Sequence, residues 1–155
     1  MSNRGKQVRC AIVEEKKDDI LGLVSLVSVN QMNQSAELHI MIGDKENQGK
    51  GIGSFAVKEM LNHAFFNMNL NRVELTVIEN NKRAIHLYEK NGFVYEGRKI
   101  KASDKGEFMD MLMYAVLRDD FMEGTLILSS LSKVFSTLMC PYPLQLRLIV
   151  CACSR

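Results

Sequence analysis

The residue pattern with the most chemical content is a glycine-rich segment, Gln48-Gly49-Lys50-Gly51-Ile52-Gly53-Ser54, which stands between a predicted strand and a predicted helix. Glycines let neighbouring backbone N–H groups turn toward one point, because they accept backbone angles that other residues avoid. The first amides of a helix add the positive end of the helix dipole. The segment therefore predicts a cradle for a pyrophosphate, to which the Lys50 ammonium adds positive charge.

Other uses of a short glycine cluster have their own sequence requirements. A nucleotide-binding P-loop ends in a Gly-Lys-Ser or Gly-Lys-Thr triplet, and no such triplet closes this segment. The dinucleotide-binding fingerprint fits poorly, because the third glycine stands one residue early and no strand–helix–strand unit opens the chain. A flexible surface turn is the alternative that the segment alone does not exclude.

The hydrophobic pattern predicts the elements that hold this segment in place. Alternating or β-branched apolar residues indicate strands, whereas apolar residues at three- and four-residue spacings indicate helices. The order of these elements predicts a mixed sheet flanked by helices, an α/β (α+β) fold. Strands are predicted at 8–13, 20–29, 37–42, 72–77, 93–95 and 109–116. Helices are predicted from Asn81 to Asn91, with Gly92 just past the end, and from Gly51 onward, with the apolar stripe Ile52, Phe55, Ala56, Met60, Ala64 and Met68.

The composition is that of an ordinary globular chain with one core. The 155 residues are 46% hydrophobic and 25% charged. The net charge of +2 is too small to indicate binding to nucleic acid. No apolar run reaches the roughly 20 residues of a membrane-spanning helix. Cys151 and Cys153 form a C-x-C pair without a second ligand pair at zinc-site spacing, so no metal site is predicted. The polar first residues contain no secretory leader, which predicts reduced thiols and a cytoplasmic location.

A shift in composition predicts a boundary near residues 123 and 124. Residues 124–155 carry three basic and no acidic side chains, both prolines and three of the four cysteines. We therefore expect a core, 1–123, and an atypical apolar and basic C-terminal tail, 124–155. The apolar runs of the tail, 126–128 and 144–150, leave three interpretations open: part of a dimer interface, a cover for exposed core surface, or a partly disordered segment.

Two motifs in register resemble those of the GCN5-related N-acetyltransferase (GNAT) superfamily. Gln48-x-x-Gly51-x-Gly53 resembles its acetyl-CoA signature, and Asn81–Phe93 resembles its second cofactor motif. The order and separation of the two motifs also agree with that superfamily. Residues 80–93 look most similar to the spermidine and ribosomal-protein acetyltransferases, and the resemblance extends over roughly residues 22–121.

The resemblance implies a mixed, mostly antiparallel sheet whose central strand pair splays apart to hold acetyl-CoA. The pantetheine arm is then expected to pair with the backbone of residues 40–42 like an added strand. The glycine segment would hold the pyrophosphate, and the helix from Asn81 would line the other wall of the cleft. The implied cofactor-binding residues are Ile40, Met41, Ile42, Gln48, Gly49, Lys50, Gly51, Ile52, Gly53, Ser54, Asn81, Ala84 and Tyr88.

The activity implied by the resemblance is transfer of an acetyl group from acetyl-CoA to a primary amine of a polyamine, an amino acid or a protein. Tyr88 shares a helix face with Ala84 and is interpreted as the hydroxyl donor to the departing thiolate, with a buried core tyrosine as the alternative. Glu37, eleven residues before Gln48, is interpreted as the base, with a solvated strand glutamate as the alternative. His39 shares the strand face of Glu37 and is interpreted as a half-buried strand residue.

One departure from the superfamily pattern bears on function. Superfamily members begin with a strand and two helices that form much of the acceptor pocket, whereas only about six residues precede the first predicted strand here. The N-terminal strand and helices are therefore expected to be missing. A truncated acyl-CoA-binding or regulatory module with little catalysis is the alternative function, and a purely structural interaction domain is a third hypothesis. The expected partners are a small-molecule or peptide amine and a second copy in a homodimer.

Overall fold

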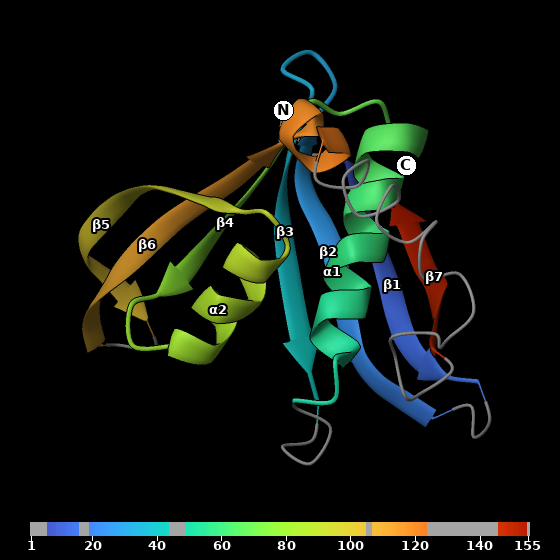
Figure 1. The fold of residues 1–155 in the computed structure, drawn as a ribbon, viewed down its shortest axis with the longest axis horizontal. Helices are drawn as coiled ribbons and strands as arrows, with labels where there is room; N and C mark the ends of the chain where they lie inside the picture. Colours follow the sequence, from blue (N-terminus) through green and yellow to red (C-terminus); the bar gives the residue numbers. More distant parts are fainter. Residues whose placement is uncertain (1–5, 16–18, 44–48, 105–106, 124–145, 155) are drawn as a thin grey trace.

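A computed structural model describes residues 6–15, 19–43, 49–104, 107–123 and 146–154. Within these residues seven strands form one mixed sheet, in agreement with the predicted fold class. The strands are β1 (Lys6–Glu14), β2 (Asp19–Asn30), β3 (Ser35–Ile42), β4 (Arg72–Ile78), β5 (Val94–Asp104), β6 (Glu107–Leu117) and β7 (Leu146–Ser154). Their order across the sheet is β5-β6-β4-β3-β2-β1-β7, and all neighbours are antiparallel except β3 and β4 (Figure 1).

The first three strands, which the sequence predicts as strands, form an antiparallel meander. Strand β3 buries Ala36 and Leu38 and turns Glu37, His39 and Met41 to the other face, because side chains alternate along a strand. The turn from β2 to β3 is closed by the Asn30 side chain, whose Oδ1 accepts the N–H of Asn33 at 3.0 Å. This turn fixes the register that pairs β3 with β2 as far as Ile42.

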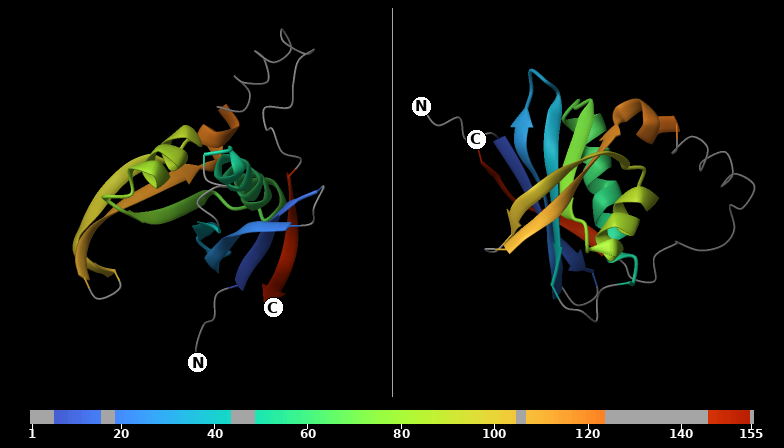
Figure 2. Two further views of the ribbon diagram at one scale, coloured as in Figure 1. Left: turned by 90° about the horizontal axis from the view of Figure 1, so that it is seen from below. Right: turned by 90° about the vertical axis from the view of Figure 1, so that its left-hand side faces the viewer.

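Two helices cover one face of the sheet. Helix α1 (Ile52–Asn62) continues into a π-helical turn, η2 (His63–Asn67), and packs against β2, β3 and β7. Helix α2 (Lys82–Lys90) lies on the same side, in front of β4 and β6 (Figures 1 and 2). A helical turn at 118–123 ends the described core. No helix within the described ranges covers the opposite face of the sheet.

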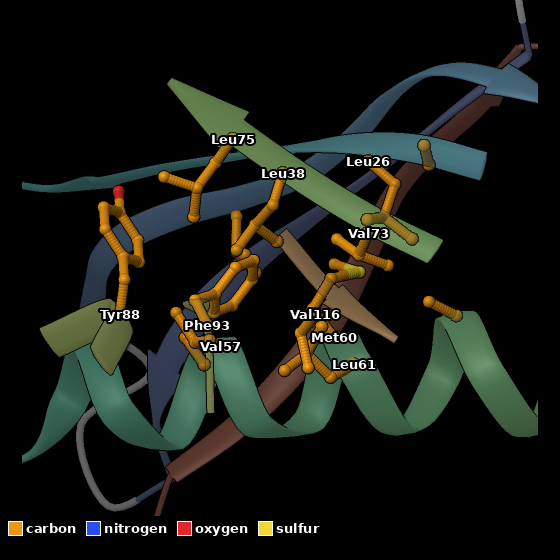
Figure 3. Close-up of a cluster of buried hydrophobic side chains, with 14 of the residues drawn as sticks. Leu26, Leu38, Val57, Met60, Leu61, Val73, Leu75, Tyr88, Phe93 and Val116 are labelled. Atoms are coloured by element: carbon orange, nitrogen blue, oxygen red, sulfur yellow. The ribbon is translucent and has the colours of Figure 1, made fainter. Parts of the chain in front are cut away.

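The hydrophobic core lies between α1, α2 and the sheet (Figure 3). Four residues of the predicted α1 stripe are fully buried: Ile52, Ala56, Met60 and Ala64. The stripe is wider than predicted, because a helix lying flat on a sheet also buries the positions beside its central row. The additional buried residues are Val57, Leu61 and Phe65, while Phe55 is half-buried.

Helix α2 is bounded as the sequence predicts. The Asn81 side chain caps its start, with Oδ1 accepting the N–H of Ala84 at 3.1 Å. At the other end Gly92 takes φ +89°, a left-handed conformation that glycine adopts without a steric penalty. The N–H of Phe93 then bonds the carbonyl of Tyr88 at 3.1 Å. These contacts fix which face α2 turns to the sheet.

The central strands β3 and β4 are paired over a short distance only. Their parallel ladder contains three residue pairs, from Ser35↔Arg72 to Glu37↔Glu74. Beyond Glu37, β3 keeps β2 as its neighbour, while β4 stays with β6 along its whole length. The two strands therefore diverge toward their C-terminal ends (Figure 1), which is the splayed central pair that the resemblance implies.

The tail contributes a strand to this sheet. Strand β7 runs antiparallel to β1, from Glu14↔Leu146 to Gln7↔Ser154, and Leu146 and Leu148 pack against the core. Part of the predicted apolar run 144–150 thus forms the edge of the same sheet. The run 126–128 lies outside the described residues, and the boundary at 123 and 124 stays a prediction.

We expect Gly22→Ala to lower the free energy of unfolding by about 1–3 kcal/mol, the usual cost of overpacking. A Cβ at Gly22 would lie 2.4 Å from the Met41 carbonyl oxygen and 3.1 Å from the Ile42 Cα, so β2 and β3 would have to separate. Urea unfolding measures the change. Gly43→Ala is the matched control, because its Cβ would meet only the Leu21 carbonyl oxygen at 3.4 Å. Equal stability of the two variants would contradict the close approach.

Candidate active site

A cavity of about 480 Å³ lies on the helix-covered side of the sheet, where β3 and β4 diverge. Three elements meet around it: the end of β3, the glycine segment leading into α1, and one face of α2. Most of the sequence-predicted cofactor residues are brought together here: Ile40, Ile42, Gly49, Gly51, Gly53, Ser54, Asn81, Ala84 and Tyr88.

The other predicted cofactor residues have different positions. Met41 points to the opposite face of the sheet, where 63% of its side chain is exposed, so only its backbone is near the cavity. Ile52 is buried in the core at 1% exposure. Lys50 is exposed beside the segment and does not line the cavity. Gln48 lies outside the described residues.

The glycine segment has the backbone that the sequence predicts for an anion cradle. Gly49 and Gly51 have φ of +88° and +82°, so both occupy the left-handed region. Gly51 is the N-cap of α1 and supplies no side-chain hydrogen bond to the first amides of the helix. These amides point outward from the helix start, toward the cavity that Gly51 and Gly53 line.

Helices α1 and α2 are held close together at this cavity. A Cβ on Gly53 would lie 3.1 Å from Leu87 Cδ2, a tight contact, so the absence of a side chain at Gly53 lets the two helices approach closely. The Asn91 amide nitrogen donates to Ser54 Oγ at 3.2 Å and to the Leu87 carbonyl at 2.7 Å. These bonds tie the end of α2 to the start of α1 and set the width of the cavity.

The sequence analysis missed four cavity-lining residues on α2: Arg83, His86, Leu87 and Lys90. A Cβ on Gly49 would lie 3.2 Å from Arg83 Nη2, which places the guanidinium beside the glycine segment. Arg83, Leu87 and Lys90 recur at four and three residues, the spacing of one helix face, so the signal was present in the sequence. Together they give the cavity two cationic groups and an apolar wall.

A second cavity, of about 600 Å³, opens on the other face of the sheet. Glu37, His39, Thr76 and Met41 are among its lining residues. Ile40 and Tyr88 line both cavities, and they do so where the β3–β4 ladder has ended. The divergence of the strands therefore brings the two cavities to opposite sides of one side chain, Tyr88.

Tyr88 points from α2 toward the strands, with its hydroxyl oxygen at the far end of the ring (Figure 3). Its side chain is 8% exposed, and its ring packs edge-on against Phe93 with the ring centres 5.8 Å apart. Burial raises the pKa of the Tyr88 phenol above its ordinary value, because the phenolate would lose hydration. The phenol is therefore a protonated hydrogen-bond donor at neutral pH.

Glu37 and His39 form a contact within the second cavity. Glu37 Oε1 lies 3.2 Å from His39 Nε2, and the side chains are 34% and 58% exposed. On the neighbouring strand, Glu74 is the register partner of Glu37, and its carboxylate is 3.2 Å from Arg72 Nε. Glu37 is the acidic side chain among the lining residues of this cavity, and Arg9 is the basic one.

The family of this chain follows from comparison with known proteins. The acetyltransferase (GNAT) domain family matches residues 1–94, so the chain belongs to that family. It is 33% identical over 112 residues to spermidine N(1)-acetyltransferase of Vibrio cholerae, a match that covers 72% of this chain and 64% of the relative. It is 32% identical over 106 residues to a putative ribosomal N-acetyltransferase of Bacillus subtilis, covering 66% of this chain and 56% of the relative. The chain therefore spans less than two thirds of these relatives.

The fold is shared with solved structures of the same family. The crystal structure of the V. cholerae spermidine N-acetyltransferase in complex with CoA and spermine superimposes with a TM-score of 0.70. The two chains are 31% identical, and the match covers 75% of this chain and 68% of the other. In the parts of the present chain that the structure describes, no helix is long and apolar enough to span a membrane, and no three His, Cys, Asp or Glu side chains gather as metal ligands.

We expect the free energy of unfolding of the wild type to fall, relative to Tyr88→Phe, as the pH rises above about 10. The native phenol holds its proton more tightly than an unfolded tyrosine. The contribution of Tyr88 to the free energy of unfolding is therefore complete below the pKa of the unfolded tyrosine. It is lost as the pH passes through the raised native pKa. Urea unfolding from about pH 8 to pH 11 measures the difference. Parallel stability curves for the two proteins would show that Tyr88 is not buried as a neutral phenol.

Proposed function

We propose that this chain is an N-acetyltransferase that moves the acetyl group of acetyl-CoA to a primary amine of a polyamine. The observation that carries the proposal is that Tyr88 lines both the cavity of the glycine segment and the cavity of Glu37. Coenzyme and acceptor can then approach one reaction centre from opposite faces of the sheet. Membership of the GNAT family and the names of the V. cholerae and Escherichia coli spermidine acetyltransferases among its relatives support the acceptor class.

The helix-side cavity has the chemistry that coenzyme A requires. Backbone amides of the glycine segment and the start of α1, with Arg83 nearby, suit a pyrophosphate. Ile40, Ile42 and Leu87 give an apolar wall for the pantetheine arm. Among the described residues, no strand pairs with the β4-facing side of β3 beyond Glu37, so the backbone there can pair with the amides of that arm.

The reaction requires two proton movements. An alkylammonium with a pKa near 10.4 costs about 4.6 kcal/mol to deprotonate at pH 7, and the neutral amine then attacks the thioester carbonyl. Glu37 attracts the cationic acceptor, takes a proton from the acceptor ammonium group and passes that proton to water. The C–N bond forms as the C–S bond breaks, the nitrogen then loses its second proton, and this proton neutralises the departing thiolate as free coenzyme A. The Tyr88 hydroxyl donates a hydrogen bond to the developing thiolate, and this bond strengthens in the transition state.

Acetyl-CoA should raise the melting temperature of the protein. At about 100 times Kd a ligand that binds only the native state adds about 2.7 kcal/mol, or roughly 5–10 °C for a chain of this size. Differential scanning fluorimetry measures the shift. In Gly49→Val the shift should shrink, because a β-branched residue opposes the φ of +88°. An unchanged melting temperature of the wild type at saturating coenzyme would refute the coenzyme site.

Tyr88→Phe should lower kcat about 10²-fold in a thiol-release assay, the lower range for loss of an acid–base group. The assay uses acetyl-CoA with a panel of polyamines, amino acids and peptides, and spermidine-like acceptors should give the highest kcat/KM. Tyr95→Phe is the matched control, because Tyr95 is 51% exposed and lines neither cavity. Full activity of Tyr88→Phe would exclude the donor role. Coenzyme binding without turnover of any amine would identify a binding module instead.

A homodimer and a cytoplasmic location, both expected from the sequence, stay predictions. Sedimentation of the purified protein tests the first and fractionation of cells tests the second.

A further inference from the structure

His39 has no part in the mechanism above, yet it is in direct contact with Glu37. Its Nε2 lies 3.2 Å from Glu37 Oε1, and both side chains line the cavity proposed for the acceptor. The two residues are separated by one position on β3, so alternation places them on the same face of the sheet. An ionised carboxylate only accepts hydrogen bonds, so a hydrogen bond across this contact uses a hydrogen on Nε2 of His39.

The contact restrains the Glu37 carboxylate. A glutamate on an exposed strand face samples several rotamers, and a hydrogen bond to one oxygen removes part of that freedom. A carboxylate accepts bonds at both oxygens, so Oε2 can take an ammonium group while Oε1 is held by His39. His39 is itself 58% exposed, so replacing it with another polar side chain leaves the core intact.

Resting on the proposed acetyl transfer, we propose that His39 is a positioning residue. In its neutral form it holds the Glu37 carboxylate toward the acceptor amine, and in its protonated form it pairs with that carboxylate and displaces the cationic acceptor. Imidazole is the side chain whose charge ordinarily changes between pH 5 and 8. As the pH falls and His39 gains its proton, acceptor binding should therefore weaken, which raises KM with a smaller effect on kcat.

Other charged groups face this pair from the neighbouring elements. His39 is in register with Ser25 on β2, and Ser25 is in register with Arg9 on β1. Ordinary carboxyl, phenol and guanidinium groups titrate outside pH 5 to 8, so they do not produce an inflection there. The groups concerned are Arg9 on β1, Arg72 and Glu74 on β4, and Tyr88 on α2.

The test compares wild type with His39→Gln, which keeps an N–H donor but cannot be protonated. The wild-type kcat/KM for a polyamine is divided by that of His39→Gln. This ratio cancels the ionisation of the coenzyme and of the acceptor, because it affects both proteins equally. We expect this ratio to be level at alkaline pH and to fall as the pH is lowered, by up to about tenfold per pH unit once His39 is protonated. His39→Leu, which also loses the donor, should be about tenfold slower than His39→Gln at every pH.

His63→Gln is the matched control, because His63 lies in η2, bonds Asn67 at 2.9 Å and lines neither candidate cavity. Its ratio to wild type should be level at all pH values. A level ratio for His39→Gln as well would overturn the inference while leaving the acetyltransferase proposal intact. Absence of turnover by the wild type with every amine would overturn both.

A second measurement needs no turnover. The chain has three histidines, so their ring signals can be resolved by NMR. Glu37→Gln should shift the Nε2 signal of His39 and leave those of His63 and His86 in place. An unshifted His39 signal would show that the Glu37–His39 contact is not formed in solution and would overturn the inference.

Discussion

The structure depends on the short pairing between β3 and β4. A strand edge inside a sheet exposes backbone N–H and C=O groups, and such groups require partners. Because the ladder ends after Glu37↔Glu74, the remaining residues of β3 have no strand partner on that side within the part of the chain that the structure describes. The same divergence allows cavities to form on both faces, with Tyr88 and Ile40 shared between them. The proposed coenzyme site and acceptor site both follow from this interruption.

Helix α2 determines which side chains line the cavities beside the interrupted β3–β4 pairing. Its start is fixed by the Asn81 cap and its end by the left-handed Gly92. Between these points the helix presents basic and apolar residues to one cavity and Tyr88 to both. The Asn91–Ser54 hydrogen bond and the close contact of Gly53 with Leu87 then hold α2 at a fixed distance from α1. Local capping signals in a nine-residue helix thus determine the geometry of the whole candidate site.

Much of this arrangement could be predicted from the sequence, because its determinants are local. Alternating apolar residues predicted β1 to β4, and the Asn81 and Gly92 caps predicted α2. The π-helical turn η2 was not predicted, since its residues continue the helical hydrophobic pattern. Strand β5 extends to Asp104, well beyond the predicted end at Tyr95, because pairing with β6 stabilises its polar half.

The candidate site was predicted less completely than the fold. The glycine segment and Asn81, Ala84 and Tyr88 were found because they form motifs, and they do line one cavity. Arg83 and Lys90 were missed, since exposed cations on a helix are common and only the packing of α2 places these two at the cavity. The Glu37–His39 contact depends on side-chain rotamers, which no sequence pattern specifies.

The pairing of β7 with β1 has a consequence for biosynthesis. Residues near position 10 and residues near position 150 are neighbours in the sheet although almost the whole chain separates them. Contacts between such distant segments form slowly, and a chain leaves the ribosome from its N-terminus. Until Leu146–Ser154 have emerged, the outer backbone groups of β1 lack their final partner, and a nascent chain exposes an edge to which other strands can add. This edge of the sheet therefore closes only after all the other described strands have been synthesised.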